Sequence, residues 1–236
     1  MSRRATLISG AGCEQLGECY GRCVFVPLGH LLMRLRQPAS RAVEVVELRQ
    51  RLGAERAGAE RAGATGEEER ALAAEVSRAK RAAAEAIDGV ASCGSCAAGQ
   101  PWPVGGFAGG ACCSGSTAVV FDDHEVAALA GAGTRPGDLR PPSGRDAHAG
   151  CAFRGAEACA LELAHRPARC VHYVCDSLRA ELHRGGRLDE VEARLAALDR
   201  AMRRFTEAHR ARQDRETLAP VIEAVQAAAR RGRSTR

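Results

Sequence analysis

Apolar side chains recur every three or four residues along the segment 187–212, and charged residues occupy the other faces. The apolar positions are Leu188, Val191, Leu195, Leu198, Met202 and Phe205. This heptad-like spacing predicts an amphipathic helix over 181–212 with one continuous apolar face, as in coiled coils. Such a face needs a cover, which is either another helix of the same chain or a second copy. The remaining segment 213–236 is expected to be helical at first and then a frayed basic tail.

A second helical pattern covers 38–88. Val45, Leu48 and Leu52 share one face, and a later set follows the same spacing: Leu72, Val76, Ala79, Ala83 and Ile87. Between these sets, Gly-Ala-Glu-Arg-Ala occurs at 53–57 and again at 58–62. Each Gly costs a helix about 1 kcal/mol relative to Ala, so the pattern predicts a break over 53–66. The helix resuming at Glu67 is expected to pack against 187–212 as an antiparallel hairpin, and a homodimer through 187–212 is the alternative.

The centre of the chain, 89–180, is rich in Gly, Pro and Ser and therefore reads mostly as loop. The β-branched run Thr117–Phe121 is compatible with a strand. A helix over Glu125–Ala130 should follow, capped by Asp122 or Asp123 and ended by Gly131. Loops with so few apolar residues need another source of order, and metal ligation is the obvious candidate. Residues 1–37 show no clear periodicity and read as a disordered leader.

Composition narrows the classes of protein that fit. The chain has 236 residues, a net charge of +5 and only 3% aromatic residues, and Lys80 is its single lysine among many arginines. The charge is spread along the chain without aromatic interleaving, which argues against a nucleic-acid-binding function. The sequence contains no apolar run of the ~18–20 residues that a membrane span requires. We therefore expect a cytoplasmic protein without membrane contact, whose thiols stay reduced.

Cysteine is the most informative residue, because the chain contains 11 of them. Eight lie in the central segment and are the candidate metal ligands: Cys93, Cys96, Cys112, Cys113, Cys151, Cys159, Cys170 and Cys175. Two thiolates spaced as C-x-x-C can bind one metal ion with little chain strain, as in zinc and iron–sulfur sites. Adjacent cysteines serve one centre only in a tight turn, so the spacing leaves open one centre or two. His165 and His172 flank Cys170 and could replace a thiolate.

Taken together, these motifs resemble the YkgJ-type cysteine-cluster family, which is described as a zinc- or iron-chelating domain. The resemblance covers roughly residues 90–178 and lies in the following stretches: Cys93–Cys96, Cys112–Cys113, Phe121–Leu129 with Glu125, Gly150–Phe153, Cys159–Leu161 and His165–Cys170. In the family the first cysteines lie close to the Cys-Cys pair, whereas here residues 97–111 separate them. One related branch resembles flagellin lysine methylases, which keeps an enzymatic role open.

The sequence thus predicts a mainly α-helical protein with a small, irregular, metal-stabilised cysteine-cluster domain over 89–180. The function it indicates is chelation of zinc or iron by clustered thiolates. Two alternatives stay open: an iron–sulfur enzyme or redox protein, and a helix-mediated assembly protein with a structural metal.

Overall fold

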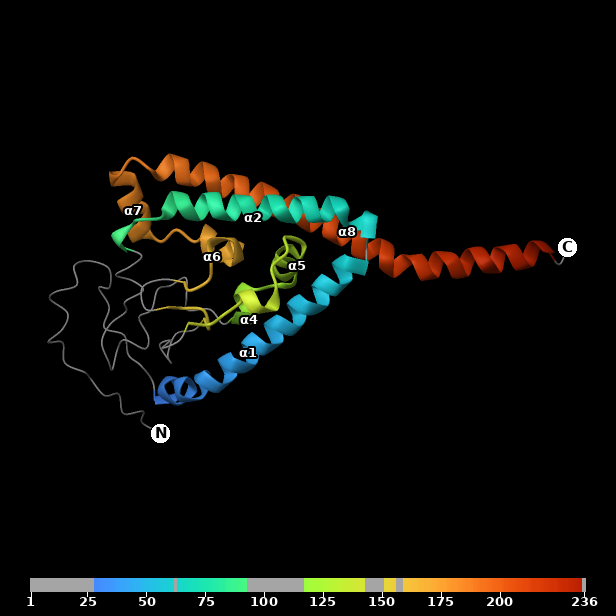
Figure 1. Ribbon diagram of the computed structural model, residues 1–236, viewed down its shortest axis with the longest axis horizontal. Helices are drawn as coiled ribbons and strands as arrows, with labels where there is room; N and C mark the ends of the chain where they lie inside the picture. The colour runs from blue at the N-terminus through green and yellow to red at the C-terminus, as the bar shows by residue number, and fades with distance from the viewer. Residues whose placement is uncertain (1–27, 62, 93–116, 143–150, 156–158, 235–236) are drawn as a thin grey trace, which may run out of the picture.

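The computed structural model describes residues 28–61, 63–92, 117–142, 151–155 and 159–234 (Figure 1). This part of the chain is mainly helical, which confirms that the fold is mainly α, and its only strand-like feature is an isolated bridge between Arg154 and Cys159. The elements, including the short 3-10 helices η, are α1 (Leu28–Arg61), η1 (Gly63–Gly66), α2 (Glu67–Ile87), α4 (Thr117–Val120), α5 (Asp123–Gly131), η4 (Pro136–Asp138), η5 (Leu163–His165), α6 (Ala168–His172), α7 (Asp176–Arg184) and α8 (Leu188–Ser234).

Helices α2 and α8 lie side by side and run antiparallel (Figure 1). Arg187, just before α8, donates to the carbonyl of Ala86 at 2.6 Å, and Arg212 lies at 2.5 Å from Glu69 at the opposite end of α2. The apolar face of α8 is buried along this contact, at Val191, Leu195, Leu198, Ala201 and Phe205. Together with α7 and with residues of α5 and α6, this pair forms the first core cluster. A dimer through 187–212 would therefore have to exchange contacts that the chain makes with itself.

The second core cluster forms where α1 packs on α4 and α5. Val45, Leu48 and Leu52 of α1 are buried there, as their spacing predicts. They meet the apolar side of α5 and two phenylalanines, Phe121 and Phe153, whose rings pack edge to face at 5.6 Å. Helix α5 also contacts α2, so it lies between the two clusters.

Helix α1 differs from its prediction at both ends. It begins at Leu28 rather than at 38, and it continues through the glycine repeat to Arg61. The predicted break is confirmed at Gly63–Gly66, and α2 begins at Glu67 as expected. The extension of the break over 53–61 is wrong, because tertiary contacts there outweigh the propensity cost of Gly. Arg56 donates to the carbonyls of Gly133 and Thr134, at 3.0 and 3.2 Å, and so fixes this stretch to the loop after α5.

Residues Thr117–Val120 form the short helix α4, so the strand predicted over 117–121 is wrong. The described part of the chain offers no strand to pair with it, and its polar groups bond elsewhere. The backbone N–H of Thr117 donates to Glu44 at 2.9 Å, and its hydroxyl accepts from the N–H of Ala152 at 3.3 Å. The helix that follows agrees with the sequence: Asp122 accepts from the N–H of Glu125 at 2.8 Å as the N-cap of α5, which ends at Gly131.

Helix α8 continues far beyond the core, to Ser234, as an arm that projects from the body (Figure 1). His209 and Arg212 are the last buried residues among the side chains of α8 that the structure describes. No helix in the described ranges is long and apolar enough to cross a membrane.

Candidate functional site

The segment around Cys151 and Cys159 folds back on itself at the edge of the second core. The N–H of Arg154 donates to the carbonyl of Cys151 at 3.4 Å, and the N–H of Ala160 donates to that of Phe153 at 2.8 Å. Phe153, between the two cysteines, is fully buried and anchors the turn in the core. This reversal of the chain, rather than spacing along the sequence, brings the two cysteines to the same place.

The Cys151 thiol is strongly influenced by its surroundings. Burial raises the pKa of the Cys151 thiol to about 11, and the nearby Cys159 and Glu44 act in the same direction. The N–H of Phe153 and the charge of Arg41 oppose this increase in pKa. In the chain alone this thiol is therefore neutral at pH 7, and a cation bound at the sulfur would be needed to favour the thiolate.

Cys170 reaches the same cluster from helix α6. Pro167 precedes the helix, and its carbonyl accepts from the N–H of Cys170 at 2.9 Å. Arg166 holds the adjoining strand-like segment, because it donates to the carbonyls of Leu161 and Cys159 at 3.1 and 3.3 Å. Cys151, Cys159 and Cys170 all pack, partly buried, against the second core cluster. In the Arg-Pro-x-x-Cys motif, Arg166 and Pro167 thus fix the backbone around Cys159 and Cys170 through their hydrogen bonds.

Cys175 lies apart from these three. It is the N-cap residue of α7 and packs against the first core cluster. The other four candidate ligands, Cys93, Cys96, Cys112 and Cys113, lie outside the described residues. Among the residues that are described, no group of three or more His, Cys, Asp or Glu side chains is close enough to hold a metal ion. A complete site would therefore require ligands from beyond this part of the chain.

A buried ion pair joins the two clusters. Lys80 on α2 and Glu125 on α5 bond directly, with only 1% and 4% of their side chains exposed. The second carboxylate oxygen of Glu125 accepts from the N–H of Ala168 at 2.9 Å, at the start of α6. Glu125 is therefore the residue that fixes the helix carrying Cys170. Sequence reasoning missed the pair, although Lys80 is the single lysine of the chain and lies on the apolar face of its helix.

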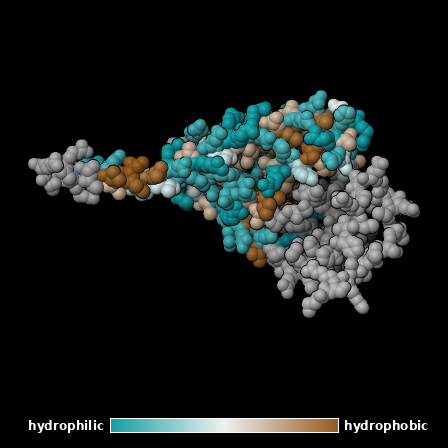
Figure 2. All heavy atoms as spheres, turned by 180° about the vertical axis from the view of Figure 1, so that it is seen from behind, coloured by the Kyte–Doolittle hydropathy of each residue, from teal (hydrophilic) through white to brown (hydrophobic). Residues whose placement is uncertain are grey.

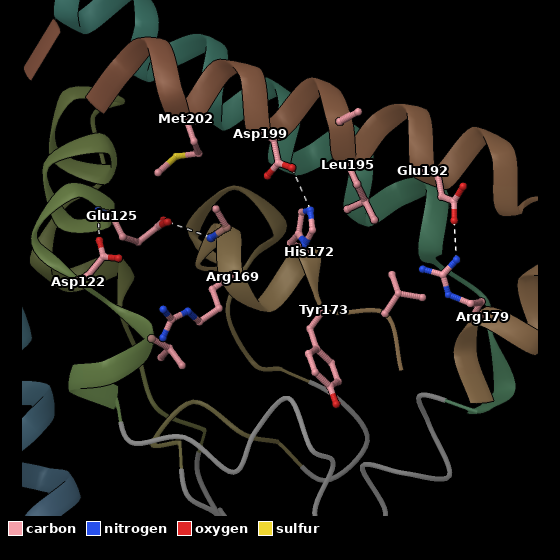
Figure 3. Close-up of a pocket in the computed structure, with 14 residues that line it drawn as sticks. Asp122, Glu125, Arg169, His172, Tyr173, Arg179, Glu192, Leu195, Asp199 and Met202 are labelled. Atoms are coloured by element: carbon pink, nitrogen blue, oxygen red, sulfur yellow. Dashed lines mark hydrogen bonds and ion pairs between the residues drawn. The ribbon is translucent and has the colours of Figure 1, made fainter. Parts of the chain in front are cut away.

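An open groove of about 760 Å³ runs between α6 and α8 (Figure 3). His172 points across it to Asp199 at 3.1 Å, and Arg179 pairs with Glu192 at 2.6 Å. Both pairs link α8 to a shorter helix on the opposite side, α6 for His172 and α7 for Arg179. His172 is thus engaged with α8, and the other histidine beside Cys170, His165, has its Nδ1 3.0 Å from the Thr134 hydroxyl.

The acidic residues at 122–125 have structural partners. Asp122 caps α5, Asp123 pairs with Arg51 at 2.7 Å, and Glu125 pairs with Lys80. Helix capping and ion pairing account for these carboxylates.

Comparison with known proteins found no matching family model, no matching curated protein and no matching solved structure.

Proposed function

We propose that this protein binds zinc or iron through cysteine thiolates, with Cys151, Cys159 and Cys170 as one part of the ligand set. The observation that carries the proposal is that all three pack against the second core cluster, although they are not close enough to one another to hold a metal ion by themselves. Two segments separated along the chain, the turn at 151–159 and helix α6, place three cysteines against the same core cluster. Thiolates are ligands that zinc and iron–sulfur centres favour over hard cations, so the donor chemistry fits these metals.

The ends of the described segments support the participation of further cysteines. Thr117 is hydrogen-bonded to Ala152, next to Cys151. Covalent geometry keeps Cys113, four residues earlier, within about 14 Å of Thr117. Ser92 is bonded to Glu181 of α7, at 2.9 Å, and Cys93 follows it directly. We therefore propose that Cys112 and Cys113 belong to the same ligand set as Cys151, and that Cys93 and Cys96 are further candidate ligands.

The role of the metal in this proposal is to hold the cysteine-bearing stretches of 89–180 to one another and to the second core cluster. The described helices already have two apolar cores, so the metal stabilises the connection rather than the whole fold. A reducing compartment, as in the cytoplasm, would keep the thiols available for it.

The test is the metal content of protein purified without oxygen. Zinc, iron and acid-labile sulfide are measured per chain, together with the visible spectrum. The variants Cys112→Ser, Cys113→Ser, Cys151→Ser and Cys170→Ser should each lose metal. Cys19→Ser, outside the ligand set, is the matched control and should keep it. Full metal retention in all four ligand variants would overturn the proposal.

Two further measurements distinguish loss of a metal ligand from misfolding of a variant. Far-ultraviolet circular dichroism reports whether the helical body survives each substitution. Removal of metal from the unmodified chain with a chelator should expose the central thiols to alkylation while the helical signal is largely kept. Bound zinc with no visible absorption supports chelation by thiolates. Bound iron with acid-labile sulfide supports the iron–sulfur alternative instead.

A further inference from the structure

The arm formed by the end of α8 carries an apolar face that nothing in the described chain covers. Its four large apolar side chains are more than half exposed: Leu218 at 53%, Val221 at 58%, Ile222 at 52% and Val225 at 63%. Their spacing of three, one and three residues places them on a single face of the helix. Figure 2 shows this group as an apolar patch on the projecting arm.

The arm is separated from the body by a polar anchor. Glu69, at the start of α2, accepts from Arg212 at 2.5 Å and lies 2.6 Å from Nδ1 of His209. Arg212 also bonds Glu216 at 2.9 Å. Beyond Arg212, α2 offers no further surface, because it begins at Glu67. The contacts of the body therefore end where the exposed apolar face begins.

A solitary helix in this position has little to stabilise it. Isolated helices of this length are marginal in water, since most helical stability in proteins comes from packing an apolar face. Pro220 lies inside the arm, where it removes a backbone hydrogen bond. The arm is thus expected to gain much of its order from a partner.

We propose that this partner is the arm of a second copy of the chain, packed antiparallel. The spacing of the four apolar residues, three, one and three, is the same in both chain directions. About a point between Val221 and Ile222, an antiparallel copy places Leu218 opposite the partner's Val225 and Val221 opposite the partner's Ile222. The contact is self-complementary, as a two-fold symmetric dimer requires.

The distribution of charge selects the antiparallel orientation. Residues 213–223 carry Asp214, Glu216 and Glu223 against one arginine, Arg215, which gives a net charge of −2. Over 224–234 the charged residues are Arg230, Arg231 and Arg233, which gives +3. About this point Asp214 lies opposite residue 229 of the partner, beside the partner's Arg230, whereas parallel in-register packing would set each charge against its own copy. This dimer involves none of the candidate metal ligands, so its test is independent of the test of the proposed function.

The experiment measures the molar mass of the full chain by light scattering during size exclusion, over a range of concentrations. The unmodified chain should approach twice 24.9 kDa at high concentration. The variants Val221→Asp and Ile222→Asp should each keep the monomer mass at every concentration. Val43→Asp is the control, because Val43 is equally exposed, at 54%, but lies on α1. A monomer at all concentrations, or dimers that survive both arm substitutions, would overturn the proposal.

A charge exchange tests the orientation. Antiparallel packing brings Asp214 close to the partner's Arg230, so Asp214→Arg and Arg230→Asp should each weaken the dimer severalfold, and the double variant should restore it. In a parallel dimer Asp214 would face its own counterpart, and neither single substitution would weaken association. Unchanged single variants would therefore refute the antiparallel arrangement. Circular dichroism of every variant should show an intact body, because the arm lies outside both cores.

Discussion

The two core clusters of this protein are built in different ways. The first joins two long helices, α2 and α8, through apolar faces whose spacing is regular along the sequence. The second joins α1 to short elements and a turn, and side-chain hydrogen bonds to backbone hold its parts together. Arg49, for example, donates to the carbonyl of Leu139 at 2.8 and 3.1 Å, and Arg51 donates to that of Phe121 at 3.1 Å.

This difference in construction corresponds to where the candidate metal ligands lie. Among the described residues, the regular cluster has one candidate ligand, Cys175, packed against it, whereas the irregular cluster has three. Short elements fixed by individual hydrogen bonds can present side chains from distant parts of the sequence at one place. Regular helix pairing provides the rigid support on which such a region can be built.

The largest effect is expected from breaking the ion pair that joins the clusters. Lys80→Met leaves the carboxylate of Glu125 buried without its cation, and the loss of one partner of a buried pair costs about 3–5 kcal/mol. We expect a decrease of this size in the free energy of unfolding, measured with denaturant. The start of α6 should also lose protection against hydrogen exchange, because Glu125 bonds the N–H of Ala168.

A double substitution shows whether the buried charge is the cause. Lys80→Met with Glu125→Gln removes both charges and keeps an oxygen for the N–H of Ala168. It should be more stable than Lys80→Met alone. If the double variant were the less stable one, the pair would not link the clusters in the way described.

The sequence predicted the first cluster far better than the second. Helical periodicity is a local signal, and the faces of 67–88 and 187–212 are long enough to carry it clearly. In α1 the glycines at 53 and 58 predicted a break that contacts with the loop after α5 prevent. The β-branched run at 117–121 predicted a strand, yet Thr117 donates its N–H to Glu44 and accepts from the N–H of Ala152, and these bonds hold a helical turn.

The candidate site shows the same limit. Spacing identified the cysteines as a set, but it could not predict that Cys175 packs against a different cluster from Cys170, only five residues away. That separation depends on where α6 and α7 pack, which is a property of tertiary structure. The buried Lys80–Glu125 pair escaped notice for the same reason, since its partners lie far apart along the chain.

A smaller effect on stability is expected at the close approach between α5 and α2, where the two clusters meet. A Cβ atom at Gly131 would lie 2.8 Å from the Cβ of Ala73, which is fully buried and cannot move aside as a flexible side chain could. Gly131→Ala should therefore destabilise the protein by about 1–3 kcal/mol, although Ala favours a helix. Thermal unfolding measures this effect.

Two further variants isolate the steric cause. Gly53→Ala also adds a methyl group to a helical glycine, but its nearest neighbour would be Pro136 at 3.9 Å, so it should stabilise by about 0.5–1 kcal/mol. Ala73→Gly opens the space opposite Gly131, and Gly131→Ala should cost less in that background. Equal costs in both backgrounds would show that the contact with Ala73 is not responsible.

The smallest effect concerns the far end of the first cluster, where Glu69 meets His209 and Arg212. Burial opposes ionisation, yet hydrogen bonds from His209 and Arg212 together with their charges lower the pKa of Glu69 from 4.5 to about 2. A carboxyl with a lowered pKa stabilises the folded state above its unfolded pKa and loses this effect as the pH falls towards its folded pKa. The contribution, present above about pH 4.5, should decrease towards pH 2 by about 1–2 kcal/mol after allowance for solvent screening.

Glu69→Gln should remove this part of the acid dependence, and the exposed Glu68→Gln is its matched control. The melting temperature of the unmodified chain should fall between pH 4.5 and 2 more steeply than that of Glu69→Gln, while Glu68→Gln follows the unmodified chain. Hydrogen exchange should assign the loss to the α2–α8 end and leave the second cluster protected, since Glu69 has no bond to α1, α4 or α6 among the contacts of the described chain. Equal loss of protection in both clusters would mean that the two regions unfold as one unit, and the distinction between a regular support and an irregular, ligand-bearing region would then describe their construction but not their stability.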